Sequence, residues 1–587
     1  MPLNRRKFIQ QSALVAASLT APQFLSRLSA ADAPAAAPAT SPATPVSNTT
    51  AAVAAPPAIV YPPAPTPIVA PAGFGVAPGP FQPTWESLAA YKSAPDWFRD
   101  AKLGIWAHWG PQCQPEMGDW YAQKMYQEGS ADYKFHVQKY GHPSKFGFKD
   151  VINEWKAEKW DPEHLISLYK NAGAKYFTAM ANHHDNFDMF NSKYQPWNSV
   201  AIGPKQDIVN GWKKAARDAG LRFGVTCHGD RAWSWYQAAQ GADKKGPLAG
   251  VHYDGLMSKA DGKGLWWDGL DPQDLYAQYH PVGDYDWPQN ARHGAVPLDK
   301  AFTEKFFNRI IDLINQTDPD LVYFDDTILP LYPSTDVGLR IAAYFYNTNL
   351  ARHGKLEAVL TGKGLDAEQQ KCLVLDVERG VTDGIQAQPW QTDTCIGAWH
   401  YERSLFDQHK YKTAESVARM LLDIVSKNGC LQLNIPLPGN GLPDADELKF
   451  LAEFTTWMNT NSEGIYASRP WKVYGEGPSV SGTQQRGQFG GLRDVRSYTP
   501  QDIRFMQKGA TLYAYALGWP DNGQLNITSL AEGAPNADSK IEGVELLGFS
   551  EPIKFTRAAT GLALTLPAQK VGDYAYGFKI SGNGLTV

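Results

Sequence analysis

The sequence predicts an α/β fold, a (β/α)8-like barrel followed by a C-terminal all-β sandwich domain. From about residue 81 to about residue 470, short β-branched and aromatic runs alternate with amphipathic helical patterns, as in a parallel sheet or barrel. Beyond Arg469-Pro470-Trp471 the helical periodicity ends, and short alternating runs are separated by Gly, Asn and Pro. At least six strand-like runs over about 390 residues favour a closed barrel over an open sheet.

The expected barrel elements follow one another along the chain. The strand-like runs are Gly104–Trp109, Ala174–Ala181, Leu221–Cys227, Leu321–Phe324, Cys372–Val377 and Cys430–Ile435. Asp161–Gly173 is expected to be a helix, because it has an Asp N-cap, Pro at the first helical position and a Gly stop. Further helices are expected at Ile208–Gly220, Lys300–Thr317, Thr413–Asn428 and Asp444–Asn461. In the C-terminal part, Thr511–Leu517 alternates as a strand does.

The N-terminal residues are expected to lie outside the fold. A twin-arginine pattern at Arg5-Arg6 precedes an apolar run, Ala13–Leu19, and a small-residue exit at Ser29-Ala30-Ala31. These features predict a signal peptide over residues 1–31 and a periplasmic or extracellular protein. An Ala/Pro-rich linker is then expected over 32–80, the barrel over 81–470 and the sandwich over 471–587.

Composition narrows the possible partners. A formal net charge of −5 argues against nucleic acid or an anionic membrane surface as a partner. After the leader, no apolar stretch reaches the roughly 18 to 20 residues of a membrane span. The five cysteines are odd in number and lack a C-x-x-C spacing, which argues against a disulfide framework and a zinc ribbon.

Candidate functional residues follow the expected strands. His108-Trp109, His183-His184-Asp185 and Asp325-Asp326 come directly at strand ends, and Glu378 ends another run. Because the carboxyl ends of barrel strands meet at one face, these groups should share a pocket. His and Asp side chains hydrogen-bond hydroxyl groups and Trp faces cover apolar sugar surfaces, so the pocket suits a polyhydroxylated ring.

Two alternatives apply to these residues. A metal site is the main rival for His108, His183, His184 and Asp185, although no H-x-x-x-H or H-E-x-x-H spacing is present. Of Asp325 and Asp326 only one can face the pocket, since successive residues of an extended chain point in opposite directions. Asp325 is closer to the strand. The alternative to a catalytic role is a structural one, in which Asp325 caps the following turn.

Ordered motifs covering most of residues 83–475 resemble the α-L-fucosidases of glycoside hydrolase family 29. They include Leu103–Gly110, Gly118-Asp119-Trp120-Tyr121, His183-His184-Asp185, the strand ending at Asp325, and the run Leu422–Gly429 with Leu433-Asn434-Ile435. The resemblance implies a retaining mechanism with Asp325 as nucleophile. It also implies that His108, Trp120, His183 and His184 bind the fucose hydroxyls and ring. Two further residues are expected to bind substrate from the resemblance: Tyr323, which stands where many relatives carry Trp, and Asp119, which replaces a frequent Glu.

The resemblance leaves the acid/base residue to be assigned. In one branch of the family it is a Glu directly after a Trp, but here that pair is Trp390-Gln391, and an amide cannot shuttle a proton. In another branch it lies in a Glu-x-Gly unit about a dozen residues earlier, which Glu378-Arg379-Gly380 resembles. Glu378 is therefore the expected acid/base, with Asp393 and Asp376 in reserve.

The resulting hypothesis is an exported, retaining exo-α-L-fucosidase that acts on a fucosylated glycan or fucose-containing polysaccharide without a cofactor. A catalytically inactive fucose-binding protein is one alternative, and it would bind fucose without turnover. A hydrolase of a related sugar, such as an α-L-galactoside, is another. A metal-dependent hydrolase is a third, and it would lose activity to a chelator.

Overall fold

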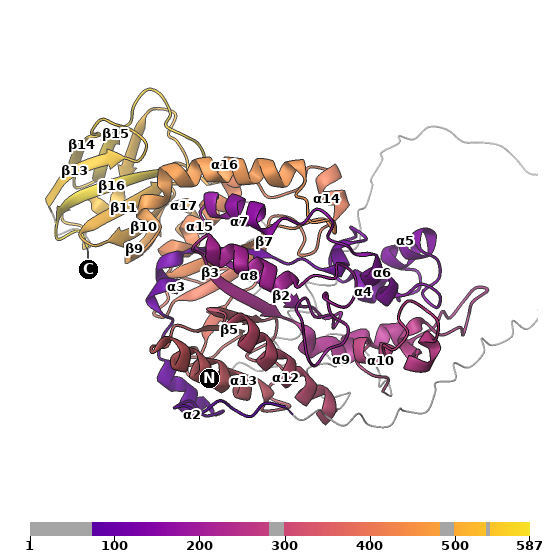
Figure 1. Ribbon diagram of the computed structural model, residues 1–587. Coiled ribbons are helices and arrows are strands. Elements are labelled where there is room, and N and C mark those ends of the chain that lie inside the picture. Colours follow the sequence, from indigo (N-terminus) through magenta and orange to yellow (C-terminus); the bar gives the residue numbers. More distant parts are fainter. Residues whose placement is uncertain (1–72, 281–298, 482–497, 536–539, 587) are drawn as a thin grey trace, which may run out of the picture. The chain divides into compact units, whose positions relative to one another are not determined.

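Eight parallel strands form a closed barrel in the computed structural model, which describes residues 73–280, 299–481, 498–535 and 540–586 (Figure 1). The strands pair in sequence order, and the last pairs with the first, with Leu103 opposite Leu431. They are β1 (Leu103–Ala107), β2 (Tyr176–Asn182), β3 (Arg222–Cys227), β4 (Leu321–Phe324), β5 (Val359–Lys363), β6 (Val374–Asp376), β7 (Trp390–Cys395) and β8 (Gly429–Asn434). The predicted barrel is confirmed.

Two of the eight strands were not predicted from the sequence, β5 and β7. The β5 sequence, VLTGK, is short and contains a glycine, and β7, WQTDTC, is largely polar, yet all residues of both are buried. Polar side chains are stable in these strands because they bind one another inside the barrel; the amide of Gln391, for example, donates to Asp376 Oδ1 at 2.9 Å. A search for apolar or alternating runs does not detect such strands.

The longer helices lie around the outside of the barrel strands (Figure 1). They are α7 (Pro162–Asn171), α8 (Ile208–Asp218), α12 (Lys300–Thr317), α13 (Val337–His353), α15 (Ala414–Ser426) and α16 (Ala445–Asn461). All five predicted helices are among them, and each begins at a capping Asp or Thr side chain, as when Asp161 accepts from the amide of His164. Only α13 was not predicted. Shorter helices are α2 (Trp85–Leu88), α3 (Asp96–Ala101), α4 (Tyr121–Lys124), α5 (Ala131–Lys139), α6 (Phe148–Glu154), α9 (Ala232–Trp235), α10 (Pro272–Leu275), α14 (Arg403–Asp407) and α17 (Pro478–Ser481).

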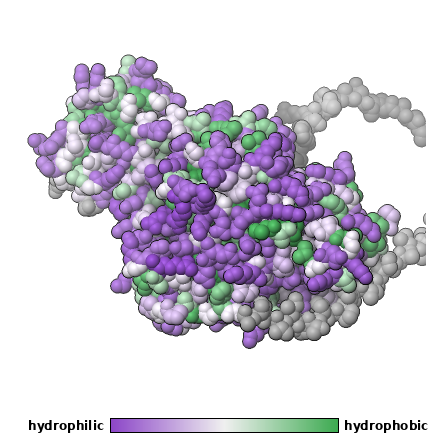
Figure 2. Space-filling view, in the orientation of Figure 1, coloured by the Kyte–Doolittle hydropathy of each residue, from purple (hydrophilic) through white to green (hydrophobic). Residues whose placement is uncertain are grey.

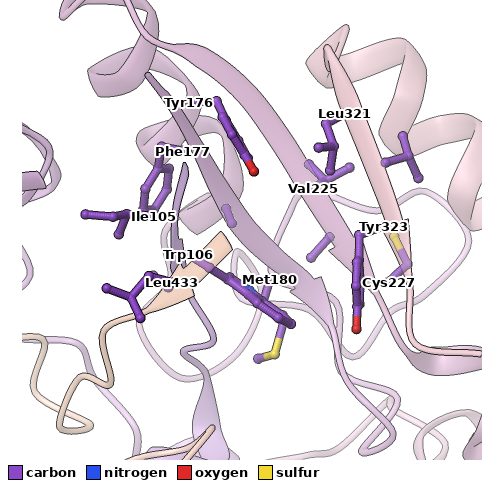
Figure 3. Close-up of a cluster of buried hydrophobic side chains, with 14 of the residues drawn as sticks. Ile105, Trp106, Tyr176, Phe177, Met180, Val225, Cys227, Leu321, Tyr323 and Leu433 are labelled. Carbon is purple, nitrogen blue, oxygen red and sulfur yellow. The ribbon is translucent and has the colours of Figure 1, made fainter. Parts of the chain in front are cut away.

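Aromatic side chains fill the barrel interior below the site. Figure 3 shows Trp106, Tyr176 and Tyr323 among aliphatic residues of the neighbouring strands. The rings of Trp106 and Tyr323 lie 5.2 Å apart, and the hydroxyl of Tyr176 donates to Gln391 Oε1 at 3.2 Å. The barrel is therefore a packed core, and only the groups at the carboxyl ends of its strands can meet a ligand.

The described contacts begin before the predicted domain boundary at residue 80. The amide of Phe74 donates to Asn308 Oδ1 on α12, and the amide of Phe81 donates to Asn347 Oδ1 on α13, each at 2.9 Å. The predicted signal peptide and the first 41 residues of the predicted linker lie outside the described residues.

The C-terminal part is a sandwich of two antiparallel sheets that share one core of buried side chains. Phe505 and Leu512 enter this core from one sheet, and Leu525 and Leu564 enter it from the other. The five-stranded sheet has β9 (Arg469–Glu476), β10 (Ile503–Lys508), β11 (Thr511–Ala516), β13 (Lys540–Leu546) and β16 (Tyr576–Asn583). The other has β12 (Gln524–Ile527), β14 (Lys554–Ala558) and β15 (Gly561–Thr565). The predicted boundary at 470/471 falls within β9.

The molecular surface and the cysteines are as the amino-acid composition predicts. Hydrophilic residues cover most of the face in Figure 2, and the hydrophobic areas on it are small and separate. All five cysteines are buried and free. In the described ranges, no helix combines the length and the apolar character that a membrane crossing requires.

Candidate functional site

Asp325 is the first residue after β4, and its carboxylate is held by three cationic or potentially cationic groups. Lys363 Nζ lies 2.6 Å from Asp325 Oδ1, and the other oxygen, Oδ2, lies 3.6 Å from His184 Nε2 and 3.5 Å from His228 Nδ1. Burial alone would raise the pKa of Asp325, but the charges of Lys363 and Arg231 outweigh it and hold that pKa well below its usual value. The side chain remains 21% exposed, so an ionised carboxylate faces the pocket.

Glu378 lies two residues beyond β6 and contacts the same ammonium group. Its Oε2 is 2.5 Å from Lys363 Nζ, and its side chain is 15% exposed. Because one oxygen of Asp325 and one of Glu378 both contact a single nitrogen, these oxygens are no more than about 5 Å apart. A pair of carboxyl groups about 5 to 5.5 Å apart is the arrangement of retaining glycosidases, whereas inverting enzymes keep the pair farther apart.

Lys363 was not identified from the sequence, because it ends the unpredicted strand β5. Burial disfavours its charged form, but the carboxyl groups of Asp325, Glu378, Asp393 and Asp376 outweigh this and raise its pKa. Lys363 is therefore an ammonium ion at any working pH. The only sequence signal for it was its place at a strand end.

Five histidine rings cluster beside these carboxylates. His108, His183 and His184 were predicted, and the structure adds His228 at the end of β3 and His400 after β7. The ring centroids of His183 and His184 are 4.3 Å apart, those of His108 and His400 4.5 Å, and those of His183 and His228 4.9 Å. His228 follows a predicted strand directly, so the rule that selected His108 could have selected it too. His400 lies beyond a strand that was not predicted.

Four of the five histidines, His108, His183, His184 and His228, have pKa values that burial lowers, so they are neutral at neutral pH. Burial and the neighbouring rings lower the pKa of His108 and of His183 well below the usual value. Burial lowers the pKa of His228 to about 4, although Asp325 opposes the shift. A neutral imidazole offers one N–H donor and one acceptor nitrogen, which suits the hydroxyl groups of a sugar. Neither ring nitrogen of His108 has a hydrogen-bond partner within the described ranges.

Hydrogen bonds fix the tautomers of the two adjacent histidines. Gln112 Nε2 lies 2.8 Å from His183 Nδ1 and donates to Asp185 Oδ2 at 3.0 Å, so His183 Nδ1 is an acceptor and its Nε2 carries the proton. His184 Nδ1 lies 2.8 Å from the carbonyl oxygen of His228, so it is the protonated nitrogen, and Nε2, which lies 3.6 Å from Asp325 Oδ2, carries the lone pair. His183 thus presents a donor and His184 an acceptor.

This assignment bears on the metal alternative. In two sets of three histidines, the ring nitrogens that could bind a metal lie within 4.8 Å of one another. One set is His108, His183 and His400, and the other is His183, His184 and His228. A metal ligand must offer a lone pair, but His183 Nδ1 already accepts from Gln112, and Nε2 is protonated. The donor chemistry of the pocket therefore favours hydroxyl groups over a metal ion.

Asp119 and Trp120 lie at the start of α4, close to His400. The amide of His400 donates to Asp119 Oδ1 at 2.8 Å, and Trp120 has a left-handed backbone with φ of 68°. Burial would raise the pKa of Asp119, but His400 and Arg379 outweigh it, so this carboxylate is ionised and can accept from a hydroxyl. Trp399, which was not predicted, has its ring 5.8 Å from that of His108 and forms an aromatic wall there.

Tyr323 was predicted to bind substrate, but its hydroxyl group binds a buried carboxylate inside the barrel. Its OH donates to Asp393 Oδ2 at 2.7 Å, so its aromatic ring is the part that remains for contact with a ligand. Burial raises the pKa of Asp393 to about 7, with Lys363 opposing the shift, and it also raises the pKa of Asp376. Both reserve carboxyl groups are fully buried, whereas the side chain of Glu378 is partly exposed. Of the three, Glu378 is placed to meet a substrate.

Asp326 faces away from this arrangement, as the strand geometry requires. Its Oδ1 lies 3.5 Å from Arg231 Nη2, and, with burial as the larger cause, its charge raises the pKa of the buried carboxyl group of Asp230. Asp325 is therefore the residue of the pair that contacts Lys363 and the histidines.

The chain matches two family models. Residues 70–463 match the model described as alpha-L-fucosidase, and residues 497–581 match the alpha-L-fucosidase C-terminal domain. Among curated proteins, it is 23% identical to the rat tissue alpha-L-fucosidase, over 85% of this chain and 91% of that protein. It is 24% identical to the human plasma alpha-L-fucosidase, over 83% and 88% of the two chains.

Solved structures show the same fold. The alpha-fucosidase of Thermotoga maritima in complex with fucose superposes with a TM-score of 0.62 at 22% identity, covering 85% of this chain and all of that chain (100%). Alpha-L-fucosidase isoenzyme 1 of Paenibacillus thiaminolyticus superposes with a TM-score of 0.55 at 17% identity, covering 83% and 98%. The resemblance drawn from the sequence motifs is thereby confirmed.

Proposed function

The chain belongs to the α-L-fucosidase family of glycoside hydrolases, and from that premise we propose that it is an exported, retaining exo-α-L-fucosidase that releases terminal α-linked L-fucose from oligo- or polysaccharides. The observation that carries the retaining mechanism is the pair of carboxyl groups, Asp325 and Glu378, that share the ammonium of Lys363. The two oxygens that contact Lys363 lie no more than about 5 Å apart, closer than the roughly 6.5 to 9.5 Å that inverting enzymes keep between their carboxyl groups to hold a water molecule.

The proposed reaction has two steps. In the first, an oxygen of Asp325 attacks the anomeric carbon, the glycosidic bond breaks, and the proton of Glu378 passes to the departing oxygen. In the second, Glu378 takes a proton from water, the water oxygen attacks the anomeric carbon, and the ester bond to Asp325 breaks. Each step forms one bond to the anomeric carbon, breaks another and transfers one proton without a change of oxidation state, so the reaction needs neither an oxidant nor a cofactor.

Sugar recognition is assigned to the neutral histidines and the ionised Asp119. The N–H of His183 and the lone pair of His184 can bind one hydroxyl group as donor and acceptor, while His108 offers two ring nitrogens without other partners in the described structure. Trp120 and the ring of Tyr323 would cover apolar faces of the sugar. Such a set of fixed donors and acceptors rejects an analogue that lacks a hydroxyl, because a buried partner would then stay unpaired.

The nucleophile is tested by replacing Asp325. Asp325→Ala should lower kcat on an aryl α-L-fucoside by on the order of 10⁴-fold, because no covalent intermediate can form. Added azide should partly restore turnover and give a fucosyl azide of inverted configuration, which NMR identifies. Asp326→Ala is the matched control, since its carboxylate faces Arg231. Loss and azide rescue in Asp326→Ala, with an active Asp325→Ala, would move the assignment by one residue.

The proton donor is tested by comparing Glu378→Gln with Asp393→Asn. Removing the donor should slow fucosides with poor leaving groups far more than an activated aryl fucoside, whose departure needs little protonation. We expect this behaviour in Glu378→Gln, because the side chain of Glu378 is partly exposed and that of Asp393 is fully buried. If Asp393→Asn alone behaves in this way, the buried carboxyl group is the donor.

Export by the twin-arginine route is supported by Arg5-Arg6, the apolar run and the Ala-rich exit. A protein exported by this route should lose its leader on the periplasmic or extracellular side of the membrane. N-terminal sequencing of protein purified from its native cells should therefore begin after about residue 30. An intact N-terminus on protein recovered outside the cytoplasm would argue against cleavage and for an uncleaved anchor.

A further inference from the structure

We propose that Lys363 is a positioning residue, which holds Asp325 and Glu378 at reacting separation and stays paired with the negative charge as it moves between them. The proposal rests on the function proposed above. It is based on two contacts of one nitrogen, 2.6 Å to Asp325 Oδ1 and 2.5 Å to Glu378 Oε2. An ammonium group has three donors and no acceptor, so it can bind both carboxyl groups together.

The two reaction steps move one negative charge between the partners of Lys363. Before the first step Asp325 is the anion and Glu378 holds the proton. After that step the Asp325 ester is neutral and Glu378 is the anion, and the second step reverses both changes. Because Lys363 contacts both side chains, the negative charge stays next to its ammonium group whether it is on Asp325 or on Glu378. A fixed cation beside both positions stabilises the charge without a rearrangement during the reaction.

The surroundings of Lys363 keep it charged and in place. Its side chain is only 9% exposed, and the ring of Tyr323 lies 5.3 Å from Nζ. The backbone at this residue is fixed as well, because the carbonyl oxygen of Lys363 accepts from the amide of Ile328 at 2.7 Å. The ionisable groups that act on Lys363 and its two partners lie in or shortly after five strands, β2, β3, β4, β6 and β7: His184, His228, Arg231, Asp325, Asp376, Glu378, Arg379 and Asp393.

The role of Lys363 can be distinguished from that of Glu378 by how strongly the rate of each variant depends on the leaving group of the substrate. Glu378→Gln should spare activated fucosides, because only proton donation is lost. Lys363→Met should slow activated and unactivated fucosides alike, by on the order of 10² to 10³-fold in kcat/KM, because it disturbs the nucleophile and the donor together. The affinity for the product L-fucose should change little, since the histidines and Asp119 hold the sugar.

The pH profile gives a second readout. Lys363 is the largest charged contributor to the low pKa of Asp325, so its loss should raise that pKa. The nucleophile of Lys363→Met would then become protonated at higher pH, and the acid limb of kcat/KM should move toward neutrality. Lys363→Arg keeps the charge and should keep the acid limb near that of the wild type, with most of the activity restored. Lys371→Met, which removes an exposed lysine paired with Glu368, is the matched control.

The experiment measures kcat/KM against pH for the wild type and the three lysine variants on one activated and one unactivated aryl α-L-fucoside. Circular dichroism checks folding, and if Lys363→Met does not fold, Lys363→Arg must still keep the acid limb. A wild-type acid limb and activity within about threefold of the wild type in Lys363→Met would overturn the role of Lys363 alone. An acid limb shifted in Lys363→Arg would also overturn it. A wild type that cleaves no fucoside would instead overturn the proposed function, and this role with it.

Discussion

The ammonium of Lys363 between two carboxyl groups is the contact on which the geometry of the pocket depends. Four carboxyl groups approach one another at the carboxyl ends of β4, β6 and β7, and without a cation their repulsion would force them apart or protonate them. With Lys363 present, Asp325 remains ionised, whereas the deeper Asp393 and Asp376 have raised pKa values because they are buried. The cation therefore keeps Asp325 anionic, although burial acts to raise the pKa of Asp325.

The histidines act by the opposite principle, because they are useful when they carry no charge. Their burial lowers their pKa values, and fixed hydrogen bonds from Gln112 to His183 and from His184 to the carbonyl group of His228 choose their tautomers. Protonated histidines would add positive charge beside Asp325, whose negative charge Lys363 already balances, and they would offer only hydrogen-bond donors. Neutral rings instead present both donors and acceptors, which is the pattern that a ring of hydroxyl groups requires.

The sequence predicted the barrel because most of its strands are apolar and its helices carry visible caps, as at Asp161 and Asp444. It also predicted that Asp325, His108 and the His183-His184 pair would meet, because strand ends share one face of a barrel. It failed at β5 and β7, whose residues are stable only through partners from other strands, such as Tyr323 for Asp393. Lys363 and His400 were missed for that reason. No local pattern shows such partners, because they are brought together only when the barrel closes.

The proposed retaining mechanism rests on the short distance between Asp325 and Glu378, and it is tested most directly by the anomer that the wild type releases first. Hydrolysis of an aryl α-L-fucoside can be followed by proton NMR, on a time scale faster than mutarotation. The account predicts that α-L-fucose forms first and that the β anomer appears only as the sugar equilibrates. Initial formation of β-L-fucose would contradict it, because a single displacement by water would then be the reaction.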